Sequence, residues 1–148
     1  AQPPELLMSG EVVMATGWNG RFFNAIVGEG APLVQVWDGQ GLDYEYFVQV
    51  KGGPNDANGM AKKALAMMTS TEMLAGSAKY IAYAPWRKSS IAIMEAGEPW
   101  YKDGKTNMVP QMPTAPANTK NYFLVDPLYW ADNGTELGEK WEAMKAGL

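Results

Sequence analysis

The sequence predicts an α/β domain in which short strands alternate with flanking helices. Three observations support this class. Short apolar runs bounded by glycine are typical of buried strands, and strict alternation over residues 44–50 is typical of an extended segment. Stretches with helical spacing and capping residues lie between them. The chain has 148 residues, 47% hydrophobic and 19% charged, which is enough for one globular domain with its own core.

The first half of the chain alternates strands and helices. A short helix over residues 5–8 ends at Ser9-Gly10, because glycine tolerates the left-handed conformation that follows a helix. In the extended segment 44–50, the period of two puts Tyr44 and Tyr46 on one face. The other elements expected here are a buried strand over 11–16, a helix that begins near Trp18-Asn19 and runs through 21–27, and a strand over 33–37.

The second half is richer in helix. Thr69 and Glu72 have the spacing of a capping box, which predicts a helix from there to about Tyr80. Residues 97–119 contain four prolines, too many for a helix or a central strand, so we expect an irregular segment. The other expected elements are a helix from near Asp56 to Met68, a helix over 86–96, a short strand over 121–125 and a last helix from Pro127 or Thr135 to Lys145.

The composition excludes several classes of function. The sequence contains no Cys and no His, so disulfides, zinc–thiolate sites and histidine bases are absent. No Ser, Thr or carboxylate arrangement matches a catalytic motif, and the acids Asp38, Asp43 and Glu45 lack the spacing of a calcium loop. We therefore expect no enzyme, no metal site and no cofactor.

Charge and hydropathy exclude two kinds of partner. The formal net charge is −4, which argues against nucleic acid, because such binding needs a basic face. No apolar run approaches the roughly 20 residues of a membrane span. The chain opens at Ala1-Gln2-Pro3-Pro4 without a basic or apolar stretch, so we expect no signal peptide within it.

Aromatic residues carry the strongest functional signal, with six Trp and seven Tyr in the chain. Trp18 stands where a predicted strand meets a predicted helix, which is where α/β folds place ligands. An indole there can stack on a ligand or hold a cation, although it can also simply pack under its own turn. Tyr44 and Tyr46 can equally well line a ligand-binding site or pack in the core. Tyr83 lies at the joint between a predicted helix and an extended segment.

Residues 9–21, SGEVVMATGWNGR, resemble a segment of the periplasmic spermidine/putrescine-type solute-binding proteins of ABC transporters. The resemblance covers essentially the whole chain, and the order and spacing of its segments are more specific than any one of them. The further segments are GLDYEYFV at 41–48, VKGGPN at 50–55, YIAYAP at 80–85 and a W-x-x-M-K helix at 141–145.

The resemblance implies a partial type II periplasmic-binding-protein fold that contains only the C-terminal half. Members of this family have two α/β lobes with the ligand in the cleft between them. By this resemblance, residues 1–43 belong to the second lobe, 44–82 form a hinge strand and part of the first lobe, and 83–148 return to the second lobe.

The resemblance also implies a set of ligand-binding residues. Trp18 matches a cleft tryptophan, and its neighbour Asn19 is also expected to bind the ligand. Tyr83 matches a cleft tyrosine, and Tyr44 replaces a second tryptophan. Tyr46 stands where polyamine binders have the aspartate that holds an amine, which argues against standard polyamine affinity. Asp126 lies near a polar cleft position and can supply a substitute charge.

The implied function is that of a periplasmic substrate-binding component of an ABC importer. Its partners are a small polar or cationic solute, such as a polyamine-like compound, and a membrane permease. A secreted carbohydrate-binding or carbohydrate-processing module is the alternative. We also expect a homodimer of this chain, because part of a lobe leaves apolar residues uncovered, namely Met60, Leu65, Met67, Met68, Met73 and Leu74.

Overall fold

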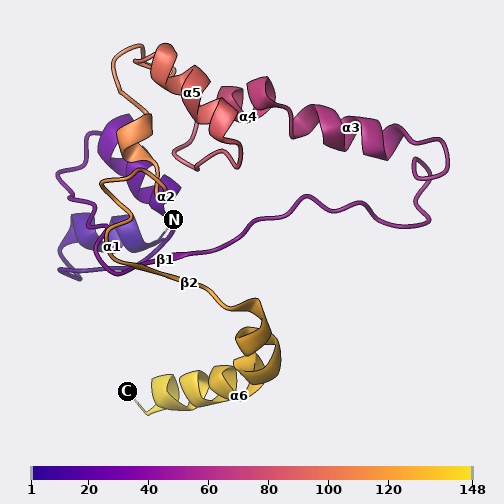
Figure 1. Ribbon diagram of the computed structural model, residues 1–148. Helices are drawn as coiled ribbons and strands as arrows, with labels where there is room; N and C mark the ends of the chain where they lie inside the picture. Colours follow the sequence, from indigo (N-terminus) through magenta and orange to yellow (C-terminus); the bar gives the residue numbers. More distant parts are fainter. Residues whose placement is uncertain (1, 148) are drawn as a thin grey trace.

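The computed structural model describes residues 2–147 and shows a helical body, one small sheet and two outlying helices (Figure 1). Ala1 and Leu148, the outermost residues of the predicted lobes, lie outside the described residues. The helical body and sheet comprise α1 (Gln2–Ser9), α2 (Asn19–Phe23), η1 (Asn24–Gly28), β1 (Gln40–Leu42), α4 (Thr71–Ser77), α5 (Lys88–Ala96), η2 (Val109–Gln111) and β2 (Tyr122–Leu124). The outlying helices are α3 (Met60–Met68) and α6 (Pro127–Ala146).

The sheet is a parallel pair of three-residue strands. β1 and β2 are in register at Gln40 with Tyr122 and at Leu42 with Leu124. The ladder continues one step further, because the backbone N–H of Val125 donates to the carbonyl oxygen of Leu42 at 2.9 Å. The carboxyl ends of both strands therefore meet at the same edge.

Side-chain amides join this sheet to the proline-containing segment. Gln40 Nε2 donates to the carbonyl oxygens of Pro113 and Asn118, at 2.9 and 2.6 Å. Asn118 Nδ2 in turn donates to the carbonyl oxygens of Pro110 and Met112, at 2.9 and 2.8 Å. Backbone groups that have no place in a helix or sheet are satisfied in this way.

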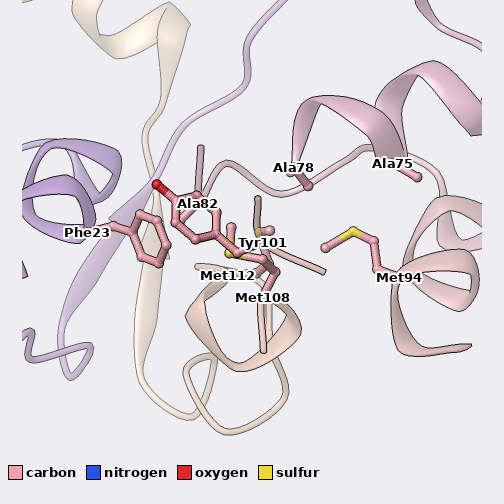
Figure 2. Close-up of a cluster of buried hydrophobic side chains, with 8 residues drawn as sticks. All are labelled: Phe23, Ala75, Ala78, Ala82, Met94, Tyr101, Met108 and Met112. Carbon is pink, nitrogen blue, oxygen red and sulfur yellow. The ribbon is translucent and has the colours of Figure 1, made fainter. Parts of the chain in front are cut away.

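The core lies where α2, α4, α5 and the proline-containing segment meet (Figure 2). The rings of Phe23 and Tyr101 pack edge to face, with centroids 5.1 Å apart and an angle of 89° between their planes. Small alanines on α4 and the following turn let methionines approach closely. The buried cluster consists of Phe23, Ala75, Ala78, Ala82, Met94, Tyr101, Met108 and Met112.

The carboxylate of Glu98 organises the irregular segment. It accepts hydrogen bonds from the backbone N–H groups of Trp100, Met108 and Val109, each at 3.0 Å. The Trp100 indole then donates from Nε1 to the carbonyl oxygen of Ala75 in α4 at 2.7 Å. The prediction of an irregular segment over 97–119 is confirmed, apart from the single turn η2.

Two predicted strands are wrong. Residues 11–16 and 33–37 form no strand in the described chain, and residues 44–50 are extended without being paired. A strand requires a neighbour for its ladder, and these runs find none within residues 2–147. Their apolar side chains stay exposed, including Val13 at 92% and Val34 at 88%.

Helix positions were predicted better than helix starts. Ser70, not Thr69, caps α4, because its hydroxyl accepts from the N–H of Met73, while the Thr69 hydroxyl donates to a carbonyl oxygen of α3. Asp56 does not begin α3, since its carboxylate accepts from Gln49 Nε2 and from the N–H of Gly52. A carboxylate used in a loop in this way delays the helix start to Met60.

The remaining helix predictions fit the structure closely. The first helix ends at Ser9 and is followed by Gly10 with φ of +76°, α5 ends at Ala96, and the last helix begins at Pro127. Leu74 is buried, contrary to expectation, whereas Met60, Met67, Met68 and Met73 are at least 41% exposed. The architecture is a mixture of helices with few short strands.

Candidate functional site

Trp18 and Asn19 stand at the start of α2. Trp18 has extended backbone angles of φ −73° and ψ 125°, and its side chain is 67% exposed. Asn19 Nδ2 donates to the carbonyl oxygen of Ala82 at 2.6 Å. Because Ala82 immediately precedes Tyr83, this hydrogen bond ties two distant parts of the chain together beside the exposed indole.

Tyr83 packs directly on the backbone of Gly20. A Cβ atom added at Gly20 would lie 2.8 Å from two ring carbons of Tyr83 and 3.0 Å from its hydroxyl oxygen. Real Cβ contacts are longer, so only glycine permits this approach. The structure therefore brings the predicted residues Trp18, Asn19 and Tyr83 to one place, and Gly20 is the residue that sequence reasoning missed there.

Tyr44 and Tyr46 form a second aromatic pair on the extended segment. Their ring centroids are 6.4 Å apart, with 36° between the planes. Both are exposed, at 58% and 71%. The predicted shared face of these two residues is present.

Asp126 caps α6 and lies at the same sheet edge as Tyr44. Its Oδ1 accepts from the backbone N–H groups of Leu128 and Tyr129, at 2.9 and 3.1 Å. Within residues 2–147 its Oδ2 accepts no hydrogen bond, which leaves one oxygen of an exposed carboxylate for a ligand. Tyr44 and Asp126 each follow the last paired residue of their strand by two positions, and the strands are parallel.

The six predicted residues thus fall into two groups. The first group is Trp18, Asn19 and Tyr83, and the second is Tyr44, Tyr46 and Asp126. In the described part of the chain, no hydrogen bond or ring contact runs directly between the groups. None of the six residues lines the surface hollow of about 350 Å³ between α1 and α2, which includes Glu5, Arg21 and Tyr80.

A second aromatic contact, missed by sequence reasoning, brings the two parts of the chain near each other. The rings of Phe47 and Trp86 lie 5.3 Å apart at an angle of 58°. Phe47 follows Tyr46, and Trp86 lies three residues beyond Tyr83. The sequence offers one signal for this contact: Trp86 stands directly after Ala84-Pro85, at the end of an extended joint, where its ring can pack against another segment of the chain.

The site holds little charge of its own. Asp43, next to Tyr44, turns its Oδ1 back to accept from the Tyr44 N–H at 2.8 Å. The described residues contain no group of three or more acidic side chains placed to hold a metal ion. Across residues 2–147, no helix combines the length and the apolar character needed to cross a membrane. The candidate site can therefore bind a ligand by aromatic stacking and through one carboxylate oxygen of Asp126.

Comparison with known proteins identifies the class. Residues 1–114 match the family described as bacterial extracellular solute-binding protein, and the chain belongs to this family. It is similar to the gamma-aminobutyric acid-binding protein of Pseudomonas aeruginosa, with 36% identity over 146 residues. That alignment covers 99% of this chain and 38% of the relative, so the chain spans about two fifths of the relative's length.

The family bears on two expectations. Membership in a solute-binding family points to a binding role and away from an enzymatic one. The six site residues remain predictions.

Proposed function

We propose that the chain is the C-terminal part of a type II substrate-binding receptor that serves an ABC permease in the periplasm. In this proposal residues 1–43 and 83–148 belong to one lobe, and 44–82 supply the hinge strand and part of the other. Two lobes that close on a solute and open to release it give such receptors their function. Membership in the solute-binding family and the relative's name support this reading.

One observation carries the proposed binding site. Trp18 is exposed at the start of α2, two residues before Gly20, on which Tyr83 packs. The Asn19–Ala82 hydrogen bond of 2.6 Å and the close approach of Tyr83 to Gly20 join the segment that carries Trp18 to the segment that carries Tyr83. Exposed aromatic rings in such a place are suited to stack on a small solute or to hold a cation.

The proposed ligand is a small polar solute with one ammonium group. Aromatic faces attract cations, and the free oxygen of Asp126 can accept from an ammonium group. By the resemblance described above, Tyr46 stands where the polyamine binders have an acid. Asp126 is then the single acid among the six candidate residues, so it can pair with one ammonium group, and a second buried ammonium without a carboxylate is costly. We therefore place an amino acid such as γ-aminobutyric acid, for which the relative is named, ahead of the polyamines spermidine and putrescine.

The test is calorimetry on a chimera in which these 148 residues replace the aligned part of the Pseudomonas aeruginosa relative. We expect γ-aminobutyric acid to bind more tightly than putrescine or spermidine. Tight binding of putrescine or spermidine would overturn the choice of ligand, and binding of oligosaccharides alone would support a carbohydrate-binding module. A folded chimera that binds none of these solutes would contradict the proposed function.

The variant Trp18→Ala tests the site itself. Loss of a stacked indole is worth roughly 1–3 kcal/mol, so the dissociation constant should rise about 5- to 150-fold. Trp141→Ala is the matched control, because Trp141 is also exposed but lies on α6, away from the proposed contacts. Equal affinities in the two variants would assign Trp18 a structural role.

For the chain by itself we propose a homodimer. The exposed methionines of α3 and the unpaired extended segments leave apolar surface that a second copy can cover.

A further inference from the structure

The surface hollow between α1 and α2 has the size and lining of a small-molecule site (Figure 1). Its volume is about 350 Å³. The lining includes the buried side chains of Pro4, Phe23 and Ala25, of which the last two are only 2% and 5% exposed. Ile81 and Tyr80 complete its apolar part. Sites for small molecules measure roughly 300–1,000 Å³ and combine an apolar lining with a few polar groups.

Charged side chains of both signs line this hollow. Arg21 comes from α2, Glu5 comes from α1, and Glu29 directly follows η1. Among residues 2–147, the ion pairs are confined to α6, and the Arg21 guanidinium donates no hydrogen bond. The guanidinium and the two carboxylates therefore share one hollow without neutralising one another, and both signs of charge are available to a ligand.

A π-helical turn fixes Glu29 at the hollow. In η1 the backbone N–H of Glu29 donates to the carbonyl oxygen of Asn24, five residues earlier, at 3.1 Å. The same two side chains meet, because Asn24 Nδ2 donates to Glu29 Oε1 at 2.8 Å. In the described chain Oε2 of Glu29 accepts no hydrogen bond. Turns of this kind are rare and recur at functional sites, which favours a binding role for this place.

We propose that the hollow is a second binding site, which takes an α-amino acid with an apolar side chain. The Arg21 guanidinium binds the ligand carboxylate, because its planar fork of donors matches two carboxylate oxygens. The carboxylates of Glu5 and Glu29 hold the ammonium group, and the apolar part of the lining accommodates the side chain. None of the six candidate residues lines the hollow, so this site does not depend on the aromatic site or on its ligand.

The experiment is calorimetric titration of the 148-residue chain with L-leucine, repeated on the chimera described above. Three related probes each lack one part of the ligand. Leucinamide lacks the carboxylate, 4-methylpentanoate lacks the ammonium group, and glycine lacks the side chain. We expect L-leucine to bind at least tenfold more tightly than each of them, both to the chain and to the chimera.

Two charge variants test the assignment of the groups. Arg21→Gln removes the guanidinium, and the double variant Glu5→Gln with Glu29→Gln removes both carboxylates. Glutamine at position 29 still offers an oxygen to Asn24 Nδ2, so the turn can keep its shape. Each variant should raise the dissociation constant for L-leucine at least tenfold, and urea unfolding checks that each remains folded.

Three further variants serve as controls. Lys62→Gln on α3 and Glu95→Gln on α5 remove the same kinds of charge at exposed positions that do not line the hollow. Trp18→Ala removes the indole of the aromatic site. All three should bind L-leucine within twofold of the unchanged chain.

Four outcomes would overturn the proposal. They are the absence of L-leucine binding, binding that survives both charge variants, binding that Trp18→Ala weakens as much as Arg21→Gln does, and equal affinity for L-leucine and any of the three probes. Binding to the chain that the chimera loses would also overturn it, because the remaining receptor polypeptide would then cover the hollow. Failure of γ-aminobutyric acid to bind the chimera would contradict the proposed function alone and leave these readouts intact.

Discussion

The rings of Phe47 and Trp86 lie 5.3 Å apart and join the extended segment 44–50 to the start of α5. Their side chains are 45% and 51% exposed, so the pair is a surface contact and not part of the core. It is the ring contact that holds the second aromatic group, Tyr44 and Tyr46, near the chain that carries Tyr83.

A double-mutant cycle measures this contact. Phe47→Ala and Trp86→Ala, alone and together, should show a coupling free energy of about 0.5–1.5 kcal/mol in urea unfolding, as expected for an aromatic pair. A second cycle pairing Phe47→Ala with Trp141→Ala serves as control and should give no coupling. Additive effects in the first cycle would show that the segment is not held by this pair.

The close packing of Tyr83 on Gly20 predicts a strong effect of one methyl group. Gly20→Ala places a Cβ 2.8 Å from the Tyr83 ring, so we expect a loss of about 1–3 kcal/mol in the free energy of unfolding. Gly76→Ala in α4 is the matched control, because its Cβ would meet no atom within 4 Å. That variant should gain about 0.5–1 kcal/mol from helix propensity. Thermal and urea unfolding of both variants should show changes of opposite sign in the free energy of unfolding. No change in Gly20→Ala would contradict the close packing of Tyr83 on Gly20.

We predict that the negative charge of the Glu98 carboxylate stabilises the folded chain. Glu98→Gln leaves a neutral oxygen to accept from the three backbone N–H groups, and hydrogen bonds to charged groups are worth more than neutral ones. We expect a loss of about 2 kcal/mol in the free energy of unfolding. Glu95→Gln, at an exposed position of α5, should change it by less than about 0.5 kcal/mol. Equal effects would mean that the carboxylate does not organise the segment.

The last helix should exchange its amides rapidly. None of the residues of α6 is buried, and Figure 1 shows it apart from the other helices. Most helical stability in proteins comes from tertiary packing, so a helix without buried residues should open locally at little cost. Hydrogen exchange should be fast over residues 127–146 and slow over α4 and α5. Protection of α6 equal to that of α4 would reveal a contact that covers it.

Self-association should depend on concentration. The apolar side chains exposed on α3 and on residues 44–50 favour pairing of one chain with another. Light scattering should therefore report a mass that rises toward that of a dimer as concentration increases. Met67→Lys and Val48→Lys should each shift the equilibrium toward monomer, whereas Lys63→Glu, which changes charge but no apolar surface, should not. A monomer at every concentration would contradict the proposed homodimer.

Local patterns predicted the helices well and the strands poorly, for a physical reason. Caps and turns act within a few residues, so Gly10, the capping-box pattern of Thr69 and Glu72, which misses the true cap Ser70 by one residue, and Pro127 mark helix ends in the sequence itself. A strand depends on a partner elsewhere in the chain. The runs 11–16 and 33–37 have strand composition, but the described residues offer them no neighbour.

The sequence points to candidate aromatic residues more readily than to the contacts that surround them. Exposed aromatic residues at the ends of elements pointed to Trp18 and Tyr83. Two residues with supporting contacts, Gly20 against Tyr83 and Trp86 against Phe47, gave no comparable signal, because these contacts are with residues more than 30 positions away. Such contacts become visible only once the chain is folded.

The parallel pairing of β1 with β2 also bears on the order in which the chain folds. The side chains of Asp38 and Asn121, which meet beside this sheet, are 83 residues apart in sequence. Closing a loop of that length costs about 4 kcal/mol of chain entropy, more than two three-residue strands recover by themselves. We therefore expect the strands to join after the helices between them have packed and shortened the loop. Asp126, which follows β2, should then be among the last of the candidate residues to reach its place.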